Sequence, residues 1–281
     1  MLSGPDYPAP AKLNLFLHVI GRRPDGYHLL QTAFRFIGCG DCLRFRVRAD
    51  GVIARVNPLA AVPESDDLCV RAARALQEAG GTSLGADIEL DKRLPLGGGL
   101  GGGSSDAATT LLALNHLWQT GLSRADLQGI GLTLGADVPV FVFGQSSFAE
   151  GVGELLQPID LPPAWYVVLT PPVSVSTREI FAQAELTRNT KPIKLAAFSA
   201  RAGLVNDLQP VVEKRYPEVT RHLAWLGQFG DARMTGSGAC VFCSFTSEQA
   251  ARNVMKALPG DMKGFVAAGL DRHPLKGLAE G

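Results

Sequence analysis

The chain has 281 residues, 46% of them hydrophobic, and its 27 basic residues balance 27 acidic ones. This length allows one large domain or two of ordinary size. The balanced charge argues against a nucleic-acid-binding surface and against a polybasic membrane patch. The sequence has no basic segment leading into an apolar one and no apolar run long enough to span a bilayer. We therefore expect a cytoplasmic protein.

The first half of the chain predicts strands followed by helices. Alternation over residues 11–20, AKLNLFLHVI, predicts a strand whose polar face carries Lys12 and Asn14. Pro24-Asp25-Gly26 predicts a turn, because proline presets φ and glycine accepts a positive φ. Further strands are predicted at 29–37, 42–48 and 86–94. Helices are predicted at 68–79, where Gly80-Gly81 ends the helix, and at 104–118 and 124–134. The last of these helices starts with the capping-box pattern Ser123-x-x-Asp126.

The proline-rich segment QPIDLPP, residues 157–163, marks the predicted boundary between an N-terminal domain, 1–157, and a C-terminal domain, 158–281. The order after it is strand, helices, two strands, helix and strand, which is typical of a split βαβ, ferredoxin-like arrangement. The sequence therefore predicts an α+β protein of two lobes with a cleft between them. The elements of the second lobe are expected at 165–170, 177–186, 207–215, 217–228, 231–245, 247–257 and 263–270.

The five cysteines include two C-x-x-C pairs, Cys39 with Cys42 and Cys240 with Cys243. The second pair lies in CVFCSF, a predicted buried strand, where residues three apart point to opposite faces. Two such thiols cannot chelate one ion, so we do not expect a four-thiolate zinc site. An odd number of cysteines without a secretory signal also argues against a disulfide framework.

Six of the seven residues from Gly97 to Gly103 are glycine. A Walker phosphate loop is excluded, because no lysine follows the glycines. The dinucleotide pattern G-x-G-x-x-G is met, but it requires a βαβ unit with an acidic residue at the end of the second strand, and here a second helix follows. A linker would have polar, unstructured flanks, whereas a strand ends at Arg93 and an amphipathic helix follows the glycines.

The remaining interpretation is a phosphate-binding loop without a Walker lysine. Glycines allow several backbone N–H groups to approach one anion, because no Cβ atom intervenes. Ser104 and Ser105 add hydroxyl groups, and the following helix adds its positive end. The glycine run therefore predicts a bound phosphate.

The run PLGGGLGGGSSDAA resembles the phosphate-binding motif of the GHMP small-molecule kinases. The resemblance extends from about Pro10 to about Gly269, through PAKLNLFLHV, RPDGYHLLQT, LNHLW, LTLGADVPVF, AEGVGE and TGSGACVF. It implies the two-lobed GHMP kinase fold, with an N-terminal mixed-sheet lobe, a ferredoxin-like C-terminal lobe and the active site in the cleft. The implied reaction is narrowed by three motifs, AKLNL, DGYH and LGADVPVF. It is the Mg²⁺- and ATP-dependent phosphorylation of the 2-hydroxyl of 4-diphosphocytidyl-2-C-methyl-D-erythritol, a step of non-mevalonate isoprenoid biosynthesis.

This resemblance implies that Lys12 and Asp137 carry the chemistry. Asp137 would accept the hydroxyl proton, while Lys12 would stabilise the attacking oxygen and orient the carboxylate. A neighbouring lysine favours the ionised aspartate that a base requires. Taken singly, a lysine at the start of a strand is usually a surface charge, and an aspartate before a proline is usually a turn or a helix cap.

The resemblance also implies a set of ATP contacts, whereas the direct ligands of magnesium stay undetermined. Asp67 stands where this family is expected to have asparagine on the adenosine side, and a carboxylate cannot donate the hydrogen bonds of an amide. Asp106 suits the positive end of the helix, and whether it holds magnesium at one remove stays open. The implied ATP-binding residues are Leu96, Gly97, Gly98, Gly99, Leu100, Gly101, Gly102, Gly103, Ser104, Ser105, Asp106 and Asp67.

For the substrate, the resemblance places Tyr27 and His28 at the cytosine and Phe181 on the other face of the base. Stacking contributes about 1–3 kcal/mol per base, and a bond from His28 to the base edge would supply selectivity. By spacing alone, Phe181 is as well explained by packing in a helix core, and His28 by a polar turn. Asn14 is interpreted either as a ligand contact or as a satisfied polar group at the lobe interface.

Gly236 and Gly238, in TGSGACVF, are implied to allow close approach to the substrate phosphates. A simple hairpin turn is the alternative. Two other functions stay open: another GHMP kinase acting on a mevalonate-type or sugar substrate, and a catalytically inactive nucleotide-binding module. The sequence leaves the oligomeric state and the kinetic order undetermined.

Overall fold

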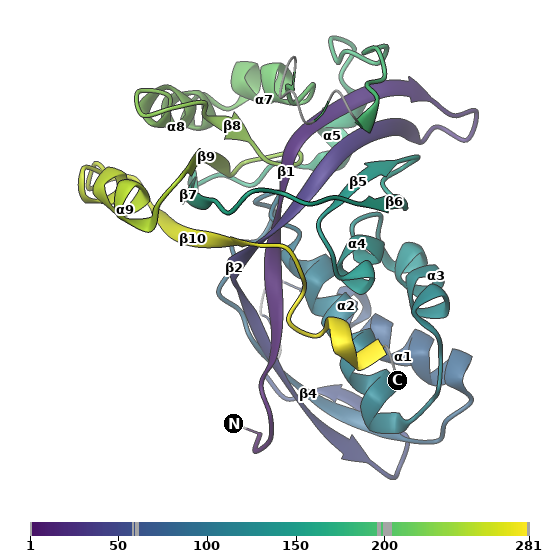
Figure 1. Cartoon of the computed structure of the whole chain (residues 1–281). Coiled ribbons are helices and arrows are strands. Elements are labelled where there is room, and N and C mark those ends of the chain that lie inside the picture. The colour runs from purple at the N-terminus through teal and green to yellow at the C-terminus, as the bar shows by residue number, and fades with distance from the viewer. Residues whose placement is uncertain (1, 58, 60–61, 196–197, 199–203, 280–281) are drawn as a thin grey trace.

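The computed structural model describes residues 2–57, 59, 62–195, 198 and 204–279 (Figure 1). Two long strands run through both halves of the molecule, with helices gathered around each half. The elements are β1 (Tyr7–Arg22), β2 (His28–Arg48), β3 (Ile53–Arg55), η1 (Glu64–Asp66), α1 (Leu68–Gly80), β4 (Gly85–Asp91), α2 (Gly102–Trp118), α3 (Arg124–Leu134), α4 (Val138–Phe143), β5 (Ser147–Glu150), β6 (Leu155–Pro158), β7 (Trp165–Leu169), α5 (Thr177–Ala182), α7 (Gln209–Arg215), α8 (Pro217–Leu226), β8 (Arg233–Met234), β9 (Val241–Phe245), α9 (Glu248–Lys256), β10 (Gly264–Leu270) and η2 (Lys276–Ala279).

In the described part of the chain, ten strands form one sheet that runs through both lobes. Its main path is β3-β4-β2-β10-β7-β9-β8, with β1 and β5 also paired to β2 and β6 paired to β5. The second lobe contributes β10-β7-β9-β8, in which every neighbouring pair is antiparallel. In chain order this is fourth-first-third-second, so the predicted ferredoxin-like lobe is confirmed.

β2 is a single strand, so the prediction of two strands at 29–37 and 42–48 is wrong. Between them the register against β1 shifts, as Pro10 pairs with Gly40 and Ala11 with Ile37. A Cβ atom at Gly40 would lie 2.2 Å from the carbonyl oxygen of Ala9. The glycines of this segment therefore accommodate a β-bulge and a close backbone approach, not a turn.

The core of the first lobe lies where α1 and α2 pack together and α2 packs on β1 and β2. α4 was not predicted, because its sequence VPVFVF is apolar throughout and shows no helical periodicity. The helix forms with Pro139 in its first turn, and it is capped after Phe143 by Gly144, whose φ is +72°. β3, β5 and β6 are too short to give a pattern, and they were missed as well.

The chain crosses between the two lobes at both of its ends. Leu17 and Val19 of β1 pack in the core of the second lobe, whereas Leu275 and Leu278 pack against the core of the first. The domain boundary near residue 157 stays a prediction. Within the described ranges, none of the helices combines the length and the hydropathy that a membrane span needs.

Cys240 and Cys243 lie on opposite faces of the sheet, as predicted. Cys240 belongs to the apolar cluster that includes Leu13 and Leu100, whereas Cys243 belongs to the core of the second lobe. Burial raises the pKa of the Cys240 thiol to about 12 and that of Cys243 to about 11. Both cysteines therefore behave as small apolar core residues.

α3 spans the predicted residues, and its capping box between Ser123 and Asp126 is formed. Gly129 in this helix is exposed, and a Cβ atom there would meet nothing within 4 Å. We expect Gly129→Ala to raise the free energy of unfolding by about 0.5–1 kcal/mol, because alanine loses less backbone entropy in a helix. Urea denaturation of both proteins measures the change, and a lower stability of the variant would contradict the prediction.

Candidate active site between the two lobes

A cleft of about 400 Å³ lies between the lobes, as the sequence predicted. Most of its wall comes from the first lobe and is dominated by the glycine run. The second lobe closes the opposite side, mainly with α5 and the loop between β8 and β9. Among the lining residues are Lys12, Asn14, Thr32, Leu68, Lys92, Pro95 to Ser104 and Asp137 from the first lobe, and Thr177, Phe181 and Gly236 to Gly238 from the second.

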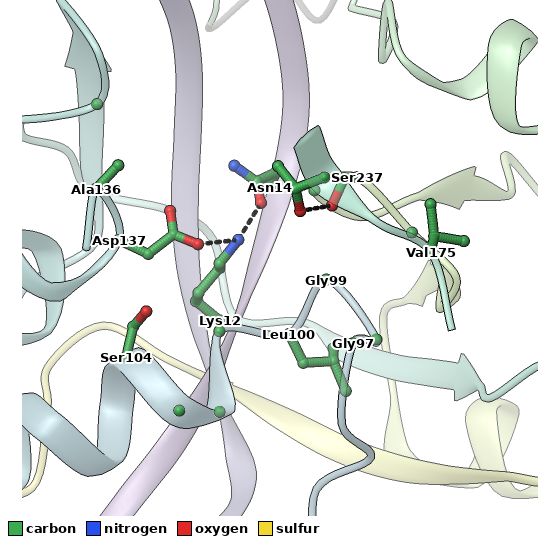
Figure 2. A pocket seen from close by; sticks show the side chains of 18 of the residues that line it. Lys12, Asn14, Gly97, Gly99, Leu100, Ser104, Ala136, Asp137, Val175 and Ser237 are labelled. Atoms are coloured by element: carbon green, nitrogen blue, oxygen red, sulfur yellow. Dashed lines mark hydrogen bonds and ion pairs between the residues drawn. The ribbon is translucent and has the colours of Figure 1, made fainter. Parts of the chain in front are cut away.

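Lys12 and Asp137 meet at the centre of this cleft (Figure 2). Lys12 lies on β1 and is 2% exposed, and its Nζ is 3.1 Å from Oδ2 of Asp137. Asp137 directly precedes α4, and its side chain stays 36% exposed. A buried ammonium is thus paired with a carboxylate that remains open to the cleft.

A chain of hydrogen bonds fixes the ammonium of Lys12. Lys12 Nζ donates to Oδ1 of Asn14 at 2.5 Å, and Nδ2 of Asn14 donates to Oγ1 of Thr32 at 3.0 Å. The Thr32 hydroxyl donates to the carbonyl of Phe16, so it must accept from Asn14. This orients the Asn14 amide with its oxygen toward Lys12. Asn14 is therefore a satisfied polar group that also lines the cleft, and Thr32 is a residue that sequence reasoning missed.

The glycine run wraps the start of α2. Gly97, Gly99 and Gly101 have φ values between +67° and +73°. The helix then starts at Gly102, two residues earlier than predicted. The amides of Gly102, Gly103 and Ser104 have no partner within the helix, and all three residues line the cleft. This arrangement is typical of an anion site formed by a helix N-terminus.

Ser105 and Asp106 lie inside the lobe and not along the cleft, so the ATP contacts predicted for them are not supported by the geometry. Ser105 is fully buried, and its hydroxyl donates to the carbonyl of Pro10 at 2.7 Å. Oδ2 of Asp106 accepts from Nζ of Lys92 at 2.6 Å. The turn of the helix explains the difference, because it leaves Ser104 at the cleft and rotates the next two residues toward the core.

Lys92 joins two buried carboxylates under the glycine run. Its ammonium also donates to Oδ2 of Asp41 at 2.6 Å, and Oδ1 of Asp41 accepts from the amides of Arg93 and Leu94. Burial raises the pKa of Asp106 to about 7, with the charge of Asp41 adding to the effect and Lys92 opposing it. Sequence reasoning missed this cluster, because its members come from three separate segments.

We expect Asp106→Asn to change how stability depends on pH. The folded pKa of about 7 lies above the unfolded value of about 4, so the folded state binds the additional proton between these values. The stability of the wild type therefore falls as pH rises through this range. Relative to the wild type, the variant should gain about 2 kcal/mol between about pH 5 and about pH 8. Urea denaturation at both pH values measures this, and a constant difference would contradict it.

Asp67 caps α1 and does not line the cleft. Its Oδ1 accepts from the amides of Cys69 and Val70, and its Oδ2 pairs with Arg55. The predicted adenosine contact through this side chain is thus not supported, because both oxygens are engaged. The next residue, Leu68, does line the cleft, and so does Leu96, which is 52% exposed.

Of the three residues predicted at the cytosine, only one lines the cleft. Phe181 lines the cleft, and its ring lies 4.8 Å from that of His28, tilted by 31°. Tyr27 is 63% exposed in the turn before β2 and does not line the cleft. The ring of His28 already contacts that of Phe181. The structure therefore has no gap for a base between Phe181 and the pair of Tyr27 and His28.

Gly236 and Gly238 lie in the loop between β8 and β9, which faces the glycine run. A Cβ atom at Gly236 would lie 3.0 Å from the carbonyl oxygen of Gly99. Between the two glycines, the Ser237 hydroxyl is 2.6 Å from that of Thr177 on α5. The loop is thus a hairpin whose tip lines the cleft, and sequence reasoning missed the hydroxyl groups of Ser237 and Thr177.

Family comparisons agree with this fold. The family description "GHMP kinases N terminal domain" matches residues 67–145, and "GHMP kinases C terminal" matches residues 182–264. The chain belongs to the GHMP kinases.

Within these kinases, the chain is 67% identical over 269 residues to the 4-diphosphocytidyl-2-C-methyl-D-erythritol kinase of Thiobacillus denitrificans, covering 96% of each chain. It is 63% identical over 276 residues to the same enzyme of Nitrosospira multiformis, covering 97% of this chain and 94% of the relative. A crystal structure of 4-(cytidine 5'-diphospho)-2C-methyl-D-erythritol kinase superposes with a TM-score of 0.82 at 33% identity, covering 94% of this chain and 99% of that one. The chain is therefore a member of the 4-diphosphocytidyl-2-C-methyl-D-erythritol kinase family.

Proposed function

We propose that this protein transfers the γ-phosphoryl group of ATP to the 2-hydroxyl of 4-diphosphocytidyl-2-C-methyl-D-erythritol, a step of non-mevalonate isoprenoid biosynthesis. The observation that carries the proposal is the Lys12–Asp137 pair, which lies in one cleft with the free amides at the start of α2. The identity to kinases that bear this substrate in their names supports the choice of acceptor.

In this reaction Asp137 accepts the proton of the attacking hydroxyl. Its carboxylate is exposed to the cleft, whereas the ammonium of Lys12 beside it is buried. The ammonium of Lys12 places a positive charge next to the attacking oxygen, and it pairs with the carboxylate of Asp137 at 3.1 Å. Phosphoryl transfer passes through a loose transition state, so positioning and charge neutralisation supply most of the catalysis.

The phosphates of ATP are held by backbone amides and not by a Walker lysine. The amides of Gly102, Gly103 and Ser104 and the hydroxyl of Ser104 are available at the cleft. We place the adenosine beside Leu68 and Leu96, the apolar residues at this end of the wall. In this assignment the first lobe binds ATP, and the second supplies the loop of Gly236 and Gly238 to the substrate phosphates.

The oxygen donors of the cleft fit a magnesium ion held largely by ATP. The described residues contain no group of three His, Cys, Asp or Glu side chains that could hold a metal ion. Ser104 and Asp137 both line the cleft, and magnesium with nucleotides usually takes one or two protein oxygens, phosphates and water. Bound there, magnesium would neutralise charge on the phosphates. Because ATP is a cytoplasmic metabolite, we place the reaction in the cytoplasm.

The direct test is an assay of ADP release with ATP, magnesium and the cytidyl substrate. ADP release that depends on this substrate is expected, and its absence would overturn the proposal. Release with mevalonate but not with the cytidyl substrate would indicate another GHMP kinase. ATP binding in calorimetry without turnover of any acceptor would indicate an inactive nucleotide-binding module.

A further inference from the structure

Asn206 binds three backbone groups of the second lobe at the wall of the cleft. Its side chain is buried, and its Nδ2 donates to the carbonyls of Met234 and Gly236 at 2.9 and 2.8 Å. Its Oδ1 accepts from the amide of Leu208 at 3.0 Å. Gly236 and Leu208 both line the cleft. Because two carbonyls face the nitrogen and an N–H group faces the oxygen, these partners determine how the side-chain amide is oriented.

The backbone next to this asparagine is bound to β1. The amide of Leu17 donates to the carbonyl of Val205 at 2.9 Å, and the amide of Asp207 donates to the carbonyl of Leu17 at 2.8 Å. Oδ2 of Asp207 also accepts from the amide of Val19 at 2.7 Å. The segment is therefore attached to the strand of the proposed catalytic lysine, while the side chain of Asn206 holds the loop between β8 and β9.

The two carbonyls that Asn206 holds flank Thr235, which reaches the first lobe. The Thr235 hydroxyl accepts from the amide of Asn14 at 2.9 Å and donates to a carbonyl of the glycine run at 3.4 Å. A Cβ atom at Gly236 would lie 3.4 Å from Oδ1 of Asn14, the atom that accepts from Lys12. The loop thus meets, on its other side, the group that fixes the ammonium of Lys12.

We propose that Asn206 is a positioning residue for phosphoryl transfer, which holds the loop of residues 235–238 against β1 and so aligns the acceptor with Lys12 and Asp137. The inference rests on the proposed function, in which this loop binds the substrate phosphates. Without the two N–H donors, the loop loses its attachment to the segment that is bound to β1. A misplacement of about 1 Å can cost about a hundredfold in rate.

Asn206→Asp tests the proposal, because it keeps the size of the side chain and replaces the two N–H donors by an oxygen. We expect kcat/KM for the cytidyl substrate to fall about a hundredfold. The KM for ATP should change less than about twofold, because the amides at the start of α2 belong to the first lobe. Hydrogen exchange needs no turnover, and peptides that cover residues 235–238 should exchange faster in the variant.

A double-mutant cycle with Thr235→Val tests whether Asn206 acts through the loop. Thr235→Val removes the hydroxyl that accepts from Asn14 and keeps the shape of the side chain. If both residues hold the same loop, the double variant should lose little more than the worse single variant. Independent effects on kcat/KM would multiply instead, which would overturn the proposal.

The matched control is Asn115→Asp, which changes a buried asparagine outside the cleft. Nδ2 of Asn115 donates to the carbonyl of Leu122 at 3.1 Å, so this variant also loses a hydrogen bond to the backbone. It should be less stable than the wild type but keep kcat/KM within about twofold.

Equal losses of kcat/KM in the Asn206 and Asn115 variants, or equal effects on both substrates, would show a merely structural role for Asn206. If Asn206→Asp does not fold, Asn206→Ala introduces no charge, and the same comparison of the two substrates decides. A wild type without turnover of the cytidyl substrate would contradict the proposed function. Unchanged hydrogen exchange of the loop in the Asn206 variant would instead overturn the role of Asn206.

Discussion

Asp137→Asn should lower kcat about a thousandfold, as expected for the loss of a general base. The amide keeps the size of the side chain and can still accept from Lys12, which lies 3.1 Å away, but it cannot take the hydroxyl proton. Binding of ATP should change little, because the amides at the start of α2 are untouched. Steady-state kinetics measure kcat, and calorimetry measures the affinity for ATP.

The matched control for this variant is Asp160→Asn, which changes an exposed aspartate outside the cleft. It should keep the activity of the wild type within a factor of about two, since surface substitutions usually have small effects. If Asp137→Asn kept more than a tenth of the wild-type kcat, the base would have to be another group. Circular dichroism of both variants would establish that the fold is retained.

Local signals predicted many of the elements correctly. Ser123 and Asp126 form the predicted capping box, and α3 begins and ends where its periodicity indicated. The order of strands and helices also predicted the ferredoxin-like lobe, since that topology follows from connections that the chain itself specifies. The meeting of Lys12 with Asp137 came from the family motifs and not from any local pattern, because nothing along the chain relates β1 to the start of α4.

The failures arose where long-range contacts decide the structure. The strands predicted at 29–37 and 42–48 are one strand, because β1 lies close enough to make a bulge of the residues between them. Asp106 looked like an anion-site residue, but Lys92 and Asp41 engage it from other segments. A sequence pattern shows which residues share a helix face, but it does not show which distant side chain will reach them.

A substitution at Gly99, in the glycine run, is also expected to have a large effect. Its φ is +73°, and a Cβ atom there would lie 2.2 Å from the carbonyl oxygen of Thr235. Thr235 also accepts from the amide of Asn14 at 2.9 Å, so one threonine touches the glycine run, the strand of Lys12 and the loop of the second lobe. Any side chain at Gly99 must therefore separate the two walls of the cleft.

We expect Gly99→Ala to lower the free energy of unfolding by about 3 kcal/mol, from left-handed backbone strain together with overpacking. The KM for ATP should also rise at least about tenfold, because the loop that presents the α2 amides is displaced. Gly121→Ala is the matched control, since its φ is +68° but nothing lies within 4 Å of its Cβ position. It should lose only about 1 kcal/mol and keep its KM. Equal losses in the two variants, measured by urea denaturation and steady-state kinetics, would show that backbone strain alone matters and that the contact with Thr235 does not shape the ATP site.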